Sequence, residues 1–192
     1  MSKLPLSELP VLDEESATGE VRDVFDDVRR TLEIPFVPNI HRAAAGAPNV
    51  LSATWAALSK AFLSTSLPMP LASMILFSIS AARNCEYCSA VHQITCKNLG
   101  VEEDTLAIIN SDLDGLTPRR VQAIIKFAQK CAFDPQSLGA DAFADIRGEG
   151  ITDQEIVEII GLAALGNYLD TLADSMKIEV DDIFTEILGG RS

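Results

Sequence analysis

The chain has 192 residues, 47% of them hydrophobic, which is enough for one domain with a substantial core. Fifteen basic residues stand against 28 acidic residues, so the formal net charge is −13. Most of the surface therefore repels polyanions, and nucleic acid is excluded as an expected partner.

The longest uncharged run, residues 61–82, contains Pro68 and Pro70. Its uninterrupted helical part of about 14 residues is shorter than the roughly 20 that a membrane-spanning helix requires. We expect a buried core helix here and no association with a membrane. Acidic residues at 13–15 follow the first residues without an apolar segment between them. This pattern predicts no signal peptide and a cytoplasmic, reducing location.

Helical periodicity begins near the start of the chain, with apolar residues at 21, 24, 25, 28 and 32. A connector with two prolines, residues 34–39, separates this helix from a second one. The second helix has apolar residues from Leu51 to Phe62, and Pro48 suits its first turn. Pro70 then starts the apolar helix that ends near Ala82.

Three more helices are expected further along the chain. The first runs from about Cys85 to Leu99 and is stopped by Gly100. The second starts at Thr117-Pro118 and reaches about residue 132. The third follows a capping box of Thr152 and Glu155 and runs over about 153–176. No segment alternates apolar and polar residues as a strand does, so the predicted fold class is all-α.

Residues 70–95 and 152–177 show weak similarity at an offset of 82. Under this alignment Cys85 corresponds to Asn167 and Cys88 to Asp170. One interpretation is a single domain, 1–192, built from a redox half of about 48–112 and a second helical half of about 117–188. Chance similarity between two helical segments is the other.

The residues with the clearest chemical potential form the pattern Cys85-x2-Cys88-x3-His92-x3-Cys96. On a helix these four side chains fall within a stripe of roughly 80° and share one face. Zinc is one interpretation, but positions 85 and 96 are about 16 Å apart along a continuous helix, whereas zinc ligands lie about 2.3 Å or less from the metal. Three of them suffice only if Cys85 sits in the preceding loop, with Cys131 or His41 as the fourth ligand.

A redox pair is the favoured interpretation, and it needs neither a metal nor an organic cofactor. Two cysteines three residues apart at a helix start can close a disulfide with little movement. Helix-end electrostatics favour Cys85 as the reactive thiolate. His92, one turn after Cys88, favours Cys88 instead because it can accept a proton near neutral pH. Two structural cysteines and a core histidine remain the alternative.

Residues 70–100, with the apolar helix, Cys-x-Tyr-Cys-x3-His and the terminating glycine, resemble the alkylhydroperoxidase D and carboxymuconolactone decarboxylase superfamily, in particular its peroxidase-related branch. The segments 37–39 and 151–173 are similar to that branch as well. The resemblance implies an alkylhydroperoxidase D-like helical bundle, assembly into trimers or hexamers, and thiol peroxidase activity recycled by an external dithiol reductant. It also implies that Cys88 attacks the peroxide, that Cys85 resolves the product and that His92 belongs to the proton relay.

The chain departs from the family pattern at Ser73, where the family has a relay glutamate. A hydroxyl can orient water but cannot stabilise an imidazolium as a carboxylate does. We therefore expect either weakened activity or a carboxylate from elsewhere, with Glu33, Glu86 and Glu158 as candidates. The alternative function is a helical, oligomeric binding or regulatory protein that has lost the relay. No role is predicted for Cys96, Cys131 or His41.

Overall fold

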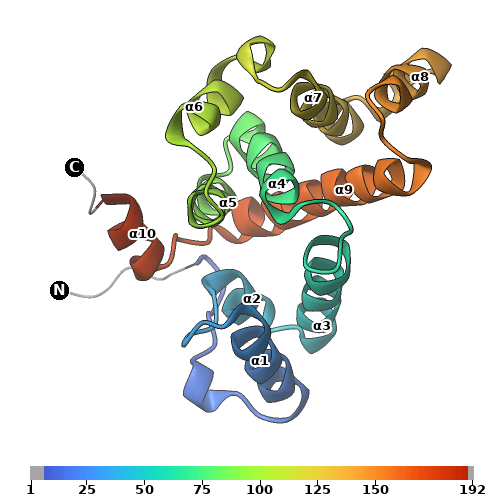
Figure 1. The fold of residues 1–192 in the computed structure, drawn as a ribbon. Helices are drawn as coiled ribbons and strands as arrows, with labels where there is room; N and C mark the ends of the chain where they lie inside the picture. Colours follow the sequence, from blue (N-terminus) through green and yellow to red (C-terminus); the bar gives the residue numbers. More distant parts are fainter. Residues whose placement is uncertain (1–6, 190–192) are drawn as a thin grey trace.

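The computed structural model describes residues 7–189, and all regular structure in this range is helical (Figure 1). This confirms the all-α fold class. Short 3-10 turns lie at 14–16, 113–115 and 135–137, and a π-helical turn at 58–62 continues α3. The α-helices are α1 Gly19–Leu32, α2 Asn39–Ala44, α3 Pro48–Ala57, α4 Met69–Arg83, α5 Glu86–Asn98, α6 Glu103–Ser111, α7 Arg119–Phe133, α8 Ala140–Gly148, α9 Asp153–Met176 and α10 Asp182–Gly189.

The main core is built around α4, which packs against α5, α7 and α9 (Figure 1). Every residue from 71 to 80 is buried, because this stretch is apolar or small on all sides and is covered by the three neighbouring helices. The prediction of a buried core helix is therefore confirmed. Gly166 allows α9 to approach α4 closely, since a Cβ atom at this position would lie 3.2 Å from Cγ2 of Ile79.

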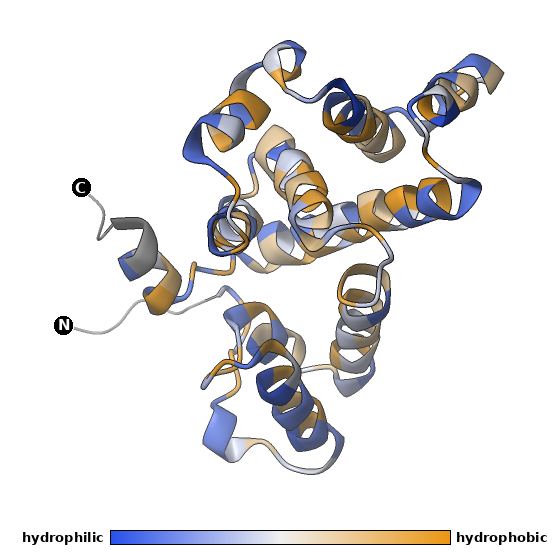
Figure 2. Cartoon of the chain, viewed as in Figure 1, coloured by the Kyte–Doolittle hydropathy of each residue, from blue (hydrophilic) through white to orange (hydrophobic). Residues whose placement is uncertain are grey.

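A smaller core joins α1, α2 and α3 in the first third of the chain. Its apolar face comes from the stripe that the sequence indicated in α1, whereas hydrophilic residues cover much of the rest of that helix (Figure 2). Phe25 and Val28 are fully buried against Leu51 and Trp55 of α3. The indole Nε1 of Trp55 donates to Oδ2 of Asp27 at 2.6 Å, which fixes the ring at the boundary of this cluster.

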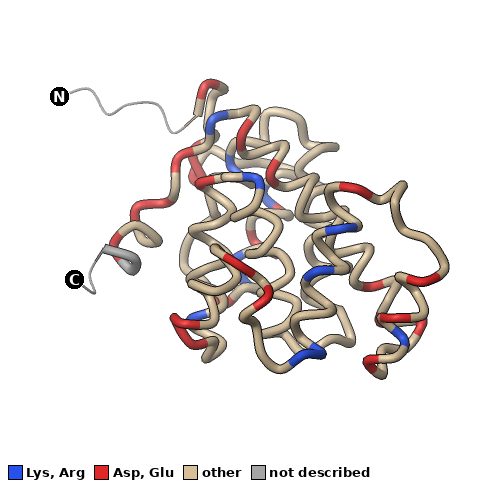
Figure 3. Tube along the Cα trace, turned by 90° about the horizontal axis from the view of Figure 1, so that it is seen from above, with Lys and Arg blue, Asp and Glu red and all other residues tan. Residues whose placement is uncertain are grey.

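The long helix α9 has the length and composition of a membrane span, and it alone meets that test among residues 7–189. Half of its apolar window is buried inside the protein, as in a core helix. Acidic residues are distributed over many surface segments, including the stretch before α10 (Figure 3). The chain thus combines an acidic surface with a largely apolar core, as expected from its net charge of −13 and its 47% of hydrophobic residues.

Most expected helices match the structure within one or two residues, and the capping box of Thr152 and Glu155 is present at the start of α9. The start expected at Thr117-Pro118 lies directly before α7, whose N-cap residue is Pro118 and has no side-chain cap. The four shortest α-helices, α2, α6, α8 and α10, were not predicted. They are too short to show a clear apolar period.

The two-halves interpretation stays a prediction. α4 ends at Arg83, and a turn separates it from α5. α9 continues without a break through residues 166–167, where the proposed alignment places that turn.

Candidate functional site

The two motif cysteines lie next to a carboxylate that is distant from them in the sequence, that of Asp170. The Sγ atoms of Cys85 and Cys88 and one carboxylate oxygen of Asp170 all lie within 4.8 Å of one another. Cys85 and Asp170 are fully buried, and Cys88 is 3% exposed. The site therefore combines two thiols and one ionisable oxygen group in an apolar environment.

A sharp turn places Cys85 at the N-terminus of α5. Asn84 adopts the left-handed conformation, with φ 57°, and ends α4. The backbone N–H of Cys85 then donates to the carbonyl of Ser80 at 3.0 Å, and its own carbonyl accepts from Ser89 at 3.0 Å as the first bond of α5. Cys85 is thus the N-cap residue, and Cys88 lies one turn into the helix on the same face.

Asp170 is held by groups of α4. Oγ of Ser80 donates to Oδ1 of Asp170 at 2.7 Å, and Nε of Arg83 lies 3.5 Å from Oδ2. Nη1 of Arg83 also donates to Oδ1 of Asn167 at 3.2 Å. Oδ2 of Asp170 accepts no hydrogen bond from a described residue. Burial raises the pKa of this carboxyl group, because the charged form loses its water.

The thiol of Cys88 is difficult to ionise in this arrangement. Its pKa is raised well above the ordinary thiol value, first because its proton is shared with the sulfur of Cys85 and then because burial disfavours the thiolate. The nearby charge of Asp170 acts in the same direction. A reaction that needs the Cys88 thiolate therefore requires a group that accepts its proton inside the site.

His92 lies one turn after Cys88 on α5, as predicted, and is 6% exposed. Its ring packs edge-to-face with Phe62, with centroids 6.5 Å apart. Burial lowers its pKa from 6.5 to about 4. The imidazole is thus neutral near pH 7, and its protonated form is disfavoured.

The structure corrects the expectation about the missing relay carboxylate. Ser73 is fully buried, and its hydroxyl has no hydrogen-bond partner among the described residues. Glu33 and Glu86 are exposed, and Glu158 accepts hydrogen bonds from Thr65 and Ser66. None of these glutamates belongs to the cysteine cluster. Asp170, which was not a candidate, is the carboxylate that lies beside the thiols.

A signal for Asp170 is nonetheless present in the sequence. The buried face of α9 includes Ile156, Ile159, Ala163, Gly166 and Ala173, and position 170 falls on the same stripe. A charged residue at a core position of an apolar helix indicates a buried partner or a functional group. The helix reaches the cysteines only through tertiary packing, so its target could not be named in advance.

The zinc interpretation is not supported in the form considered above. Among the described residues, the group with metal-ligand geometry contains Cys85, Cys88 and Asp170, and neither Cys131 nor His41 joins it. The guanidinium of Arg83 beside Asp170 opposes a second cation there. Cys96 is fully buried in the main core, and Cys131 is half-buried near the end of α7. All four cysteines are free thiols.

A second buried network explains the tyrosine between the two cysteines. The hydroxyl of Tyr87 donates to Oδ2 of Asp181 at 3.0 Å and accepts from the backbone N–H of Ile40 at 3.3 Å. The backbone N–H of Asn39 donates to Oδ1 of Asp181 at 3.0 Å. The network joins the start of α5 to the first turn of α2 and to the segment before α10. Tyr87 therefore holds the segment after α9 against the cysteine motif.

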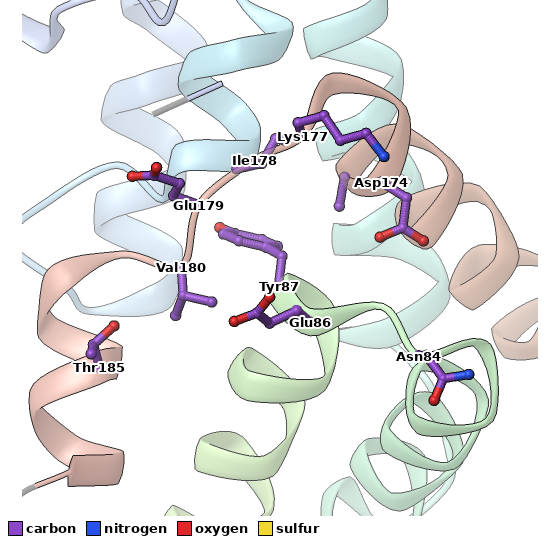
Figure 4. Close-up of a pocket in the computed structure, with 10 residues that line it drawn as sticks. Asn84, Glu86, Tyr87, Asp174, Lys177, Ile178, Glu179, Val180 and Thr185 are labelled. Carbon is purple, nitrogen blue, oxygen red and sulfur yellow. The ribbon is translucent and has the colours of Figure 1, made fainter. Parts of the chain in front are cut away.

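A pocket of about 470 Å³ opens beside this network (Figure 4). Asn84, Glu86 and Tyr87, the residues that flank Cys85, form one side of it. The end of α9 and the following segment form the other, and Figure 4 shows Asp174 and Lys177 there. Ala173, one turn after Asp170 on α9, also contributes to the lining. The pocket therefore borders the site from two sides: its lining includes the sequence neighbours of Cys85 and a residue of α9 one turn after Asp170.

The buried side chain of His41 makes the stability of the protein depend on pH. Its ring is 2% exposed, packs edge-to-face on Trp55, and leaves both nitrogens without a partner among the described residues. Burial lowers its pKa from 6.5 to about 4. The unfolded chain therefore binds more protons than the folded protein between these values, so stability is complete above pH 6.5 and falls as the pH drops towards 4.

Between pH 6.5 and pH 4 the free energy of unfolding of the natural protein should fall by up to about 3 kcal/mol because of His41, a figure that follows from the size of the pKa change. We expect this part of the fall to be absent in His41→Phe. Urea unfolding of both proteins at several pH values measures it. The raised pKa values of Asp170 and Asp181 act in the opposite direction in both proteins and cancel in the difference. Parallel pH curves for the two proteins would show that His41 is not a buried neutral histidine.

The fold and the paired cysteines define the class: an all-helical protein with an alkylhydroperoxidase D-like core and a buried Cys-x2-Cys site. Residues 48–130 match the model of the carboxymuconolactone decarboxylase family. No curated protein matches the chain.

Solved structures similar to this chain share its fold over nearly the whole length. An alkylhydroperoxidase AhpD core, an uncharacterized peroxidase-related protein from Ralstonia eutropha JMP134, has a TM-score of 0.86 and 22% identity, covering 96% of this chain and 97% of that chain. A peroxidase-related protein from Silicibacter sp. TM1040 has a TM-score of 0.82 and 19% identity, with coverages of 96% and 97%. The debrominase Bmp8 has a TM-score of 0.76 and 17% identity, covering 98% of both chains.

Proposed function

We propose that this protein is a cysteine-based peroxidase that reduces hydroperoxides with the Cys85–Cys88 pair. The observation that supports this most directly is the approach of the two sulfur atoms to within 4.8 Å at the start of α5, with a carboxylate oxygen of Asp170 inside the same limit. The two cysteines are close enough to form a disulfide after a small adjustment of the side chains. The match to the carboxymuconolactone decarboxylase family and the peroxidase-related structural neighbours agree with this class of reaction.

In the proposed reaction the Cys88 thiolate attacks one oxygen of the peroxide. A sulfur–oxygen bond forms, the oxygen–oxygen bond breaks, and an alcohol or water leaves after taking up a proton. The Cys85 thiol then attacks the Cys88 sulfenic acid, which forms the disulfide and releases water. An external dithiol reduces the disulfide and restores both thiols. His92 lies one turn after Cys88 on α5, and its imidazole stays neutral during these steps.

The pocket beside Cys85 suits a small peroxide without charge. Glu86, Asp174 and Glu179 line it together with one lysine, so an anionic peroxide meets net repulsion there. The net charge of −13 agrees with a protein that binds neither nucleic acid nor an anionic membrane surface. Four free thiols agree with a reducing, cytoplasmic environment, which also supplies a dithiol reductant.

We also propose that the chain acts as a homo-oligomer, a trimer or a hexamer. The outer face of α9 exposes Val157 at 68% and Ile160 at 37%, although the helix is otherwise part of the core. Exposed apolar side chains on a core helix are typical of a surface that another subunit covers.

Titration of free thiols tests the peroxidase proposal. We expect the reduced protein to have four reactive thiols when denatured, and to lose two of them after one equivalent of hydrogen peroxide. A dithiol such as dithiothreitol should restore both, and a peptide map should show Cys85 joined to Cys88. If all four thiols survive the treatment, the alternative is correct: a binding or regulatory protein on the same scaffold that has lost the relay at Ser73.

A further inference from the structure

We propose that Asp170 is the proton acceptor of the cysteine pair and supplies from α9 the carboxylate that α4 lacks at Ser73. The peroxide step of this inference rests on the proposed function. The activation of the thiols does not, because it concerns only the reduced protein.

The geometry around Asp170 is that of a group prepared for proton transfer. Its carboxylate lies within 4.8 Å of both sulfur atoms and is fully buried. Ser80 donates to Oδ1 at 2.7 Å and fixes the orientation of the carboxylate, whereas Oδ2 accepts no hydrogen bond from a described residue. Nε of Arg83 is 3.5 Å from Oδ2, which is long for a hydrogen bond, so this buried oxygen can still accept a thiol proton.

Charge balance favours Asp170 over His92 as the acceptor. When a thiol transfers its proton to an aspartate, one negative charge moves from oxygen to sulfur and the net charge of the site does not change. Transfer to a neutral histidine creates two charges where there were none, which a buried apolar site strongly disfavours. The lowered pKa of His92, about 4, and the raised pKa of Asp170 have this same physical cause, since burial opposes the charged form of both groups.

Arg83 favours the ionised form of the Asp170 carboxylate. Its Nε lies 3.5 Å from Oδ2, and its side chain is 33% exposed, so it links the buried carboxylate to the surface. Nη1 of Arg83 is held by Asn167, whose side-chain amide donates to the carbonyl of Ala132 at 2.7 Å. The guanidinium is therefore positioned by α9 and α7 and opposes the effect of burial on Asp170.

The proton follows a balanced path in the proposed reaction. The Cys88 thiol gives its proton to Asp170 and attacks the peroxide, and the leaving alkoxide takes the proton back from Asp170 as the alcohol departs. The Cys85 thiol then transfers its proton to Asp170 and attacks the Cys88 sulfenic acid. The hydroxide released in that step takes up the same proton and leaves as water. Asp170 ends the cycle as a carboxylate, and the two electrons of the thiols have reduced the peroxide.

The test measures how fast Cys88 of the reduced protein reacts with iodoacetamide between pH 5.5 and pH 9, with the site of modification read by peptide mass spectrometry. In the natural protein the internal transfer to Asp170 makes the Cys88 rate nearly independent of pH across neutrality. In Asp170→Asn the proton must leave to solvent, so the rate should rise tenfold per pH unit. General-base effects predict that the variant is about 100-fold slower at pH 6.5 and approaches the natural protein by pH 9.

Three controls isolate the proton acceptor from a structural role. Asp153→Asn removes a carboxylate from the same helix about 25 Å away and should leave the profile unchanged. Cys131, a half-buried thiol outside the cluster whose pKa burial raises to about 11, serves as an internal reference in each protein. Ser80→Ala keeps the carboxylate but frees its orientation, so it should give a smaller loss with a profile of the natural shape. Thermal unfolding checks that each variant is folded.

Two outcomes would overturn the inference. If Asp170→Asn reacts like the natural protein at every pH, Asp170 does not accept the proton. If it reacts faster at every pH, the carboxylate only repels the thiolate. Because iodoacetamide replaces the peroxide, either result is separate from the fate of the peroxidase proposal, which thiol titration decides.

Discussion

Cys88→Ser is expected to abolish peroxide consumption, whereas Cys85→Ser is expected to complete one oxidation and then stop. The serine hydroxyl at 88 is not nucleophilic enough to attack the peroxide, and no other motif thiol has the same position beside His92 and Asp170. Without Cys85, the sulfenic acid at Cys88 has no partner within the site and persists. A dimedone-type reagent followed by mass spectrometry should label Cys88 in the Cys85→Ser protein.

The electrostatics of the helix end favour the opposite order of attack, in which Cys85 reacts with the peroxide first. Cys85 is the N-cap residue of α5, where the backbone stabilises a thiolate, and the pKa of Cys88 is raised. Sulfenic acid on Cys85 in the Cys88→Ser protein, with none on Cys88 in Cys85→Ser, would reverse the two roles. Cys131→Ser is the matched control, since that half-buried thiol lies on α7 outside the cluster and its loss should not change peroxide consumption.

The second large effect is expected from Gly166, at the contact between α9 and α4. A Cβ atom there would lie 3.2 Å from the side chain of Ile79, which is itself fully buried. Gly166→Leu forces the two helices apart, and overpacking of this kind costs about 1–3 kcal/mol or more. Asp170 lies one turn further along the same face, so the separation should also slow the reaction of Cys88.

Gly161→Ala is the control for this substitution. A Cβ atom at 161 meets nothing within 4 Å, so the change only replaces a poor helix former by a good one. It should stabilise the protein by up to about 1 kcal/mol. Thermal unfolding of the two variants measures both effects. Equal melting temperatures would mean that the contact between α4 and α9 at Gly166 is looser than described.

The helices and the nature of the site follow from local sequence patterns, with few corrections. The apolar run in α4, the capping box before α9 and the Cys85-x2-Cys88 motif are each read from residues close together in the chain. Helix formation and the common face of residues three and four apart depend on neighbours within about one turn. Short helices such as α2 and α8 lack enough turns to show a period, and their limits are decided by packing.

The sequence by itself determined that this is a helical protein with a pair of thiols at the start of one helix and a histidine one turn later. Only the tertiary structure decided which carboxylate lies beside the thiols. Asp170 is 82 residues after Cys88, and it reaches the thiols because α9 packs against α4 and α5. Its neighbours Ser80 and Arg83 come from yet another helix. Contacts between distant segments depend on the whole packed core, whereas a helix and its motif depend only on adjacent residues.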